Sequence, residues 1–155
     1  AQRPLLIEHI EEEITSYIEP KMRKCFSSLE QELEKKGYEI EMGSMNITTE
    51  LKVKKIIVTI GRKFSMTKEE TRKFEQFSAQ LSHPIYELAE IAMEIANQEA
   101  RYCNFDILGF MIIYPEYNAE KFRTGNSDTI YTLKEISTNK EFTFAIRSCV
   151  MPAGF

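Results

Sequence analysis

The stretch from Thr67 to Tyr102, TKEETRKFEQFSAQLSHPIYELAEIAMEIANQEARY, decides the predicted fold. Thr67 and Glu70 have the spacing of a capping box, in which each side chain accepts a hydrogen bond from an otherwise unpaired backbone N–H. Apolar residues recur at helical spacing on both sides of Ser82-His83-Pro84, and the proline disfavours helical geometry at the residue before it. We therefore predict two helices in series over 67–102, the second long, packed across a β-sheet.

A second apolar stripe runs through residues 5–36. Its members lie three or four positions apart, as on one buried face of a helix: Ile7, Ile10, Ile14, Ile18, Met22, Phe26, Leu29 and Leu33. The phase continues past Pro20, so we predict one long kinked helix, or two abutting helices with Pro20 in the first turn of the second. Cys25 falls on the stripe and is expected to be a buried thiol. The whole face should be covered by this domain or by a partner.

The segments on either side of 67–102 are predicted to be β-strands. Apolar and polar residues alternate over 46–65, with Lys54-Lys55 in between, which indicates a hairpin. Residues 38–42 can add a short lead-in strand. The run 107–114 is almost wholly apolar, as is typical of a central strand covered on both faces.

Two further strands, at 129–136 and 142–149, would complete a three-strand meander with 107–114. The predicted order is helix, two strands, helices and three strands, which does not require parallel pairing. We therefore predict a single α+β domain over 1–155, with one antiparallel sheet of about five strands and helices on at least one face.

Composition limits the possible functions. A chain of 155 residues fits one domain, and its net charge of −4 argues against a nucleic-acid binder that relies on a strong basic field. The basic residues of the hairpin are interpreted as a solvated strand edge. No apolar run is long enough to span a membrane and no signal peptide is present. The chain starts at Ala1 rather than methionine, and one interpretation is a processed or truncated piece whose leader or anchor is absent.

The cysteines, Cys25, Cys103 and Cys149, are too few for a disulfide scaffold and too scattered for a zinc site. In the predicted meander, Cys103 and Cys149 lie at opposite ends of eight-residue strands, roughly 25 Å apart. A disulfide needs Cα atoms within about 7 Å, so we predict no Cys103–Cys149 bond. Asn46-Ile47-Thr48 is a glycosylation sequon, which alone decides nothing.

No catalytic, metal or cofactor site is predicted. His9 and His83 are far apart and belong to no ligand or nucleophile motif, and the glycines form no phosphate-binding loop. The most site-like group is Tyr114-Pro115-Glu116-Tyr117, with Arg123 nearby. These residues either line a ligand pocket or cover the open end of the sheet, and we favour the cover.

Two stretches of the chain resemble uncharacterised archaeal proteins that have one N-terminal membrane helix and an extracytoplasmic domain. The first runs from Ile10 through Gly37-Tyr38-Glu39-Ile40 into the hairpin, and the second from Ile130-Tyr131 to Arg147. The anchors of those proteins are similar to archaeal pilin-type leaders. The resemblance implies an extracytoplasmic, membrane-anchored domain and brings no activity or functional residues.

Two functional hypotheses follow. The first is a non-enzymatic cell-surface interaction or structural domain, held by an anchor outside this sequence, that meets a protein partner or a second copy through its N-terminal helix. The second rests on an order of elements that is similar to that of extracytoplasmic PAS-like sensors. It places a small molecule between the sheet and the 67–102 helices, near Tyr114, Tyr117, Arg123 and Tyr131. A cytosolic enzyme is a third and less favoured reading.

Overall fold

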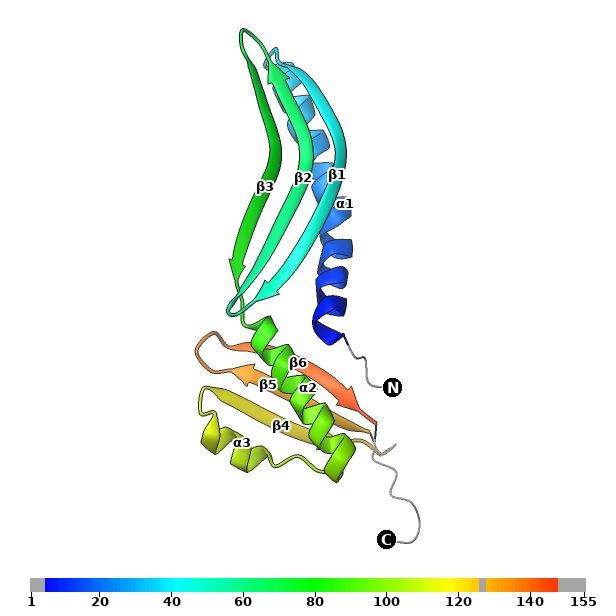
Figure 1. The fold of residues 1–155 in the computed structure, drawn as a ribbon, viewed down its shortest axis with the longest axis vertical. Coiled ribbons are helices and arrows are strands. Elements are labelled where there is room, and N and C mark those ends of the chain that lie inside the picture. Colours follow the sequence, from blue (N-terminus) through cyan, green and yellow to red (C-terminus); the bar gives the residue numbers. More distant parts are fainter. Residues whose placement is uncertain (1–4, 126–127, 148–155) are drawn as a thin grey trace. The chain divides into compact units, whose positions relative to one another are not determined.

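The computed structural model describes residues 5–125 and 128–147. Their elements, in chain order, are α1 (Leu6–Lys35), β1 (Glu39–Lys52), β2 (Lys55–Thr67), β3 (Thr71–Ser82), α2 (Ile85–Tyr102), α3 (Ile107–Ile113), β4 (Tyr117–Arg123), β5 (Thr129–Glu135) and β6 (Lys140–Ile146) (Figure 1). The α+β class and the long N-terminal helix are confirmed. The single sheet of about five strands is wrong, because the strands form two antiparallel sheets, ordered β1-β2-β3 and β4-β5-β6.

The chain divides into two compact units, where one domain was expected. The N-terminal unit comprises Glu8–Lys52 and Ile56–Leu81, and so holds α1 from Glu8 with β1, β2 and β3. Of the described residues, the C-terminal unit comprises 5–7, the turn Val53–Lys55, 82–125 and 128–147. Each unit has its own hydrophobic core.

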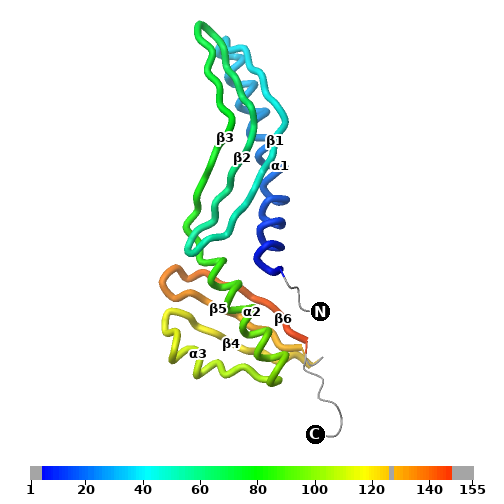
Figure 2. The backbone as a smooth tube through the Cα atoms, viewed as in Figure 1, coloured from blue at the N-terminus to red at the C-terminus, as the bar shows by residue number. Residues whose placement is uncertain are grey.

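In the N-terminal unit, α1 lies along one face of the three-stranded sheet (Figures 1 and 2). Phe26 of α1 is buried with Ile47 of β1 and with Ile60 and Phe64 of β2. The predicted hairpin is present with longer strands than expected, and Lys54 adopts a left-handed conformation (φ 59°) in its turn. Alternation of apolar and polar residues was the correct signal there.

The first predicted helix of the 67–102 stretch is wrong, because residues 71–82 form β3. Phe74 and Phe77 are spaced as on a helix, but their rings pack on Phe64 and Phe26, which lie in other elements. These contacts form only if the segment is extended beside β2, so packing overrides the local spacing. The Thr67 to Glu70 stretch is the β2–β3 turn, not a helix cap.

The predicted strand over 107–114 is also wrong, because Ile107–Ile113 is the helix α3. Asp106 caps this helix, and its Oδ1 accepts a hydrogen bond from the backbone N of Gly109 at 3.0 Å. An apolar run without a period does not distinguish a buried strand from a helix. The meander is therefore β4-β5-β6, with Tyr117 opposite Glu135 and Tyr131 opposite Phe144.

In the C-terminal unit, α2 packs on the β4-β5-β6 sheet, as predicted for the second helix of the 67–102 stretch. Leu88 and Ile95 of α2 and Tyr131 and Leu133 of β5 are fully buried in its core. Ala92 is buried between them, and its small side chain lets the helix lie close to the sheet.

The long N-terminal helix is continuous through Pro20, but its apolar face is only partly covered. Phe26 is buried, Ile10 and Ile14 are half-buried, and Leu29 is exposed. The expectation of burial along nearly the whole face is therefore met only in part. Cys25 is exposed, which corrects the prediction of a buried thiol. Its neighbour Phe26 occupies the buried position, and adjacent residues point about 100° apart on a helix.

Cys103 is disulfide-bonded, whereas Cys25 is a free thiol. The prediction that Cys103 and Cys149 form no disulfide involves Cys149, which lies outside the described residues. The geometry used for that prediction was wrong, because residues 107–113 form a helix rather than the first strand of the meander.

Candidate functional site

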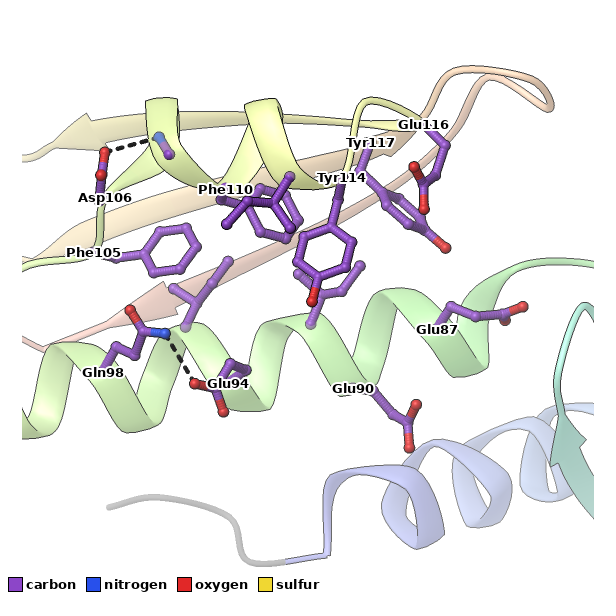
Figure 3. A pocket seen from close by; sticks show the side chains of 14 residues that line it. Glu87, Glu90, Glu94, Gln98, Phe105, Asp106, Phe110, Tyr114, Glu116 and Tyr117 are labelled. Atoms are coloured by element: carbon purple, nitrogen blue, oxygen red, sulfur yellow. Dashed lines mark hydrogen bonds between the residues drawn. The ribbon is translucent and has the colours of Figure 1, made fainter.

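A groove of about 710 Å³ lies between α2 and α3 in the C-terminal unit (Figure 3). Its volume is within the range of small-molecule and peptide-side-chain sites. The apolar part of its lining comes from α2, from the segment before α3, from α3 itself and from the start of β4: Ile91, Ile95, Phe105, Phe110, Ile113, Tyr114 and Tyr117. We call this set of four aromatic residues and three isoleucines the aromatic floor.

The rings of the floor are in contact with one another. The ring centroids of Phe105 and Phe110 are 5.6 Å apart, and those of Phe110 and Tyr114 are 5.3 Å apart. Phe105 is buried and Tyr114 is half exposed, so the row of rings runs from the core to the surface. The hydroxyl of Tyr114 points toward α2 (Figure 3).

Carboxylates surround this floor, and no Lys or Arg is among the described residues that line the groove. We call the acidic lining residues the acidic rim: Glu87, Glu90, Glu94, Asp106 and Glu116. Glu87, Glu90 and Glu94 are spaced three and four residues apart on α2, so they follow one side of the helix. Among the described residues, none of the five takes part in an ion pair.

Glu87 is the carboxylate of the rim with the most constrained surroundings. Its Oε1 accepts a hydrogen bond from the backbone N of Lys54 at 2.8 Å, whereas its Oε2 is buried and has no hydrogen-bond partner. Burial raises the pKa of the nearby Tyr117 hydroxyl, and the negative charges of Glu87, Glu135 and Glu116 raise it further. Glu87 and Glu116 therefore place two carboxylates of the groove lining close enough to act on the Tyr117 hydroxyl.

The other members of the rim differ in how freely they can meet a ligand. Glu94 accepts a hydrogen bond from Nε2 of Gln98 at 2.9 Å, and Asp106 is engaged as the cap of α3. The carboxylate of Glu90 lies on the side of α2 that faces away from α3 (Figure 3). Glu90, Glu94 and Glu116 are exposed, so they can pair with a charged ligand without first breaking an internal ion pair.

The four residues predicted from sequence do not form one site. Tyr114 and Tyr117 line the groove, but Arg123 is exposed at the end of β4 and Tyr131 is fully buried in β5. Sequence reasoning included Glu116 in the site-like group but missed Phe105 and the other four residues of the acidic rim. The three-and-four spacing of Glu87, Glu90 and Glu94 was visible within the predicted helix, and the position of α3 opposite them was not.

A second group of polar residues links α2 to the sheet. Oε1 of Glu99 accepts hydrogen bonds from Nζ of Lys121, at 2.6 Å, and from the hydroxyl of Tyr131. Burial, followed by the hydrogen bond and charge of Glu99, raises the pKa of Tyr131. Because the donors and the acceptor satisfy one another, this cluster is a structural link rather than an open site.

The two histidines belong to different units of the chain. His83 precedes α2, burial followed by the charge of Lys140 lowers its pKa, and its Nδ1 is buried without a hydrogen-bond partner. Nε2 of His9 on α1 lies 3.0 Å from a carboxylate oxygen of Glu13. In the part of the chain that the structure describes, no cluster of three or more His, Cys, Asp or Glu side chains could hold a metal ion.

None of the described helices combines the length and the apolar character that crossing a membrane requires. Comparison of the chain with protein-family models, with curated proteins and with solved structures finds no match.

Proposed function

We propose that this chain is a non-enzymatic, extracytoplasmic interaction domain, held at the cell surface by an anchor upstream of Ala1. Its α2–α3 groove would bind a protein segment that carries basic and apolar side chains. The observation that carries this proposal is the composition of the groove: within the part of the chain that the structure describes, its lining combines the aromatic floor with five acidic residues and no basic one.

The groove is complementary to a segment that carries both apolar and basic side chains. Aromatic side chains provide large contact areas, and they are enriched at the centres of protein interfaces. Carboxylates that have no ion-pair partner among the described residues favour a cationic ligand and disfavour an anionic one. A Lys or Arg side chain can lay its aliphatic part on the floor while its charged end meets the rim.

The outer surface of α3 extends the apolar area beside the groove. Leu108, Ile112 and Ile113 are 71%, 80% and 69% exposed, although all three are large apolar residues. Large exposed apolar patches usually mark an interaction surface. A partner segment longer than the groove could therefore cover α3 as well.

Two observations support the extracytoplasmic location. Cys103 is disulfide-bonded, and stable disulfides form mainly in oxidising compartments. The resemblance to anchored archaeal proteins points the same way. The gene sequence upstream of Ala1 tests the anchor, and we expect a membrane segment or a leader there. An upstream sequence with neither would contradict this part of the proposal.

The groove is tested with a synthetic helical peptide that has Lys at three-and-four spacing on one face and Leu on the other. We expect it to bind the full chain with an affinity that falls as salt is raised. Amide NMR shifts should change around Glu90, Glu94 and Tyr114. The same peptide with Glu in place of Lys should not bind, and equal binding of both peptides would contradict the proposal.

A matched pair of variants separates the groove from general charge. Glu90→Lys with Glu94→Lys reverses two exposed carboxylates of the rim and should weaken binding of the Lys–Leu peptide at least about tenfold, since close charge pairs each contribute up to a few kcal/mol. Glu8→Lys with Glu12→Lys makes the same change in net charge, at the same spacing, on α1. This control should alter binding by much less.

A second candidate function is small-molecule sensing, because Tyr114 and Tyr117 both line a groove of suitable volume. The similarity to PAS-like sensors is not supported, since the strands form two three-stranded sheets. An organic amine with an aromatic group is the matched probe. Sensing is favoured if that amine binds the groove and the Lys–Leu peptide does not.

Association through the N-terminal helix remains a separate proposal. On α1, Tyr17 is 67% exposed and Leu29 is 39% exposed, which leaves apolar surface for a partner or a second copy. Sedimentation of the full chain tests this contact, and a strictly monomeric protein would argue against self-association.

A further inference from the structure

The only Asn-x-Ser/Thr triplet of the sequence, Asn46-Ile47-Thr48, lies within β1 of the N-terminal unit. Ile47 is 8% exposed and belongs to the core beneath α1. Side chains alternate between the two faces of a strand, so Asn46 and Thr48 lie on the opposite face. Both are exposed, and in Figures 1 and 2 α1 covers only the other face of this sheet.

The neighbouring strand leaves space beside Asn46. Gly61 of β2 lies next to it, and a Cβ built on Gly61 would be 3.8 Å from the backbone oxygen of Asn46. Because Gly61 has no side chain, nothing from that position crowds the Asn46 amide. The hydroxyl of Thr48 makes only a long hydrogen bond of 3.5 Å, to the backbone oxygen of Thr59.

We infer that Asn46 carries an N-linked glycan on the uncovered face of this sheet. The inference rests on the extracytoplasmic location of the proposed function, because the transfer takes place outside the cytosol. The oligosaccharide comes from a lipid-linked phosphate donor. The Asn46 amide nitrogen forms a bond to the anomeric carbon, the bond from that carbon to the donor phosphate oxygen breaks, and the amide proton is lost.

Thr48 has a separate role in this step. The sequon requires a hydroxyl two residues after the asparagine, and Thr48 supplies it. The other asparagines of the chain lack a hydroxyl residue at that distance, so the inference specifies a single glycan. A glycan at Asn46 would cover a flat strand surface that otherwise meets solvent, and so would oppose edge or face association of the sheet.

The test is to express the full chain behind a cleavable signal sequence in a yeast secretory pathway. The mass of the whole cell-associated and secreted pool is measured before and after peptide-N-glycosidase treatment. We expect a glycan mass that the enzyme removes, and peptide mapping should place it at Asn46. Product in which Cys103 is oxidised and Asn46 is unmodified would overturn the inference.

Variants make the assignment specific. Asn46→Gln and Thr48→Ala should each abolish the added mass, whereas Thr48→Ser, which keeps the hydroxyl, should retain it. Asn118→Gln, outside any sequon, should have no effect. Retention of the added mass in Thr48→Ala would contradict the assignment, even if Asn46→Gln did not fold.

Absence of the glycan and failure of the proposed groove function give different results. Binding of the Lys–Leu peptide is measured on Asn46→Gln, which leaves the groove unchanged. Peptide binding without a glycan overturns only this inference. A glycan without peptide binding overturns only the groove proposal.

Discussion

Nζ of Lys121 on β4 lies 2.6 Å from Oε1 of Glu99 on α2, and the two side chains are only 15% and 9% exposed. The same carboxylate oxygen accepts a hydrogen bond from the hydroxyl of Tyr131. This ion pair joins the helix that provides most of the acidic rim to the sheet beneath it. The position of the groove therefore depends on charges that the groove itself does not expose.

Lys121→Met should destabilise the protein by roughly 3 kcal/mol, because it leaves the carboxylate of Glu99 buried without its cation. Urea unfolding measures this loss. Lys134→Met is the control, since its pair with Glu141 is exposed, at 34% and 53%. That variant should lose less than about 1 kcal/mol. Equal losses of unfolding free energy in the two variants would show that the Glu99–Lys121 pair contributes no more to stability than the exposed pair.

The stability contribution of Glu99 should depend on pH in a defined direction. Burial is the largest single influence and raises the pKa of Glu99, but the hydrogen bonds from Lys121 and Tyr131 and the charges of Lys121 and Arg123 together lower it more, so the net effect is a pKa below the ordinary 4.5. A carboxyl whose folded-state pKa is lowered stabilises the fold above its unfolded-state pKa. That contribution is lost as the pH falls through the folded-state value.

The difference in unfolding free energy between the wild-type protein and Glu99→Gln should therefore be largest near neutral pH. It should shrink as the pH falls below the ordinary glutamate pKa, because the protonated carboxyl then resembles the amide. Urea unfolding over a pH series measures this difference. A gap that stays constant or widens in acid would contradict the lowered pKa.

Phe105 of the groove lining and Ile112 on the outer surface of α3 should separate stability from binding. Phe105 is 6% exposed and Ile112 is 80% exposed. Phe105→Ala should cost about 3–5 kcal/mol, because it removes a buried ring, whereas Ile112→Ser should change stability by less than about 0.5 kcal/mol. Ile112→Ser should nonetheless weaken binding of the Lys–Leu peptide if α3 contacts the partner. Unchanged peptide affinity would exclude that contact.

Periodicity predicted the elements whose apolar spacing and packing agree. The stripe through Ile18 and Met22 became α1, and the alternation around Ile47 became the hairpin. Phe74, Phe77 and Leu81 led to a wrong prediction because three apolar residues at helical spacing are too few to exclude an extended strand. Their ring partners Phe26 and Phe64 come from segments that local sequence cannot bring together.

The candidate site was predicted in part for a related reason. Tyr114 and Tyr117 were recognised as site-like aromatics, and both line the groove. The carboxylates of α2 resemble an ordinary solvated helix face until α3 is placed opposite them. Because the run Ile107–Ile113 has no period, its sequence gave no reason to place a helix there.

The oxidation state of the cysteines gives the last prediction. Cys103 is disulfide-bonded, whereas Cys25 is free and exposed on α1. A thiol-alkylating reagent should therefore label Cys25 in the native protein and label Cys103 only after reduction. Cys103→Ser should destabilise the protein by about 2–4 kcal/mol through loss of the cross-link, and Cys25→Ser by less than about 0.5 kcal/mol. Mass spectrometry of a non-reduced digest should find Cys103 only in a cross-linked peptide.

Labelling of Cys103 before reduction, or a linkage between Cys103 and Cys25, would contradict this assignment. A reduced Cys103 in the native protein would also remove the main structural support for an oxidising, extracytoplasmic location.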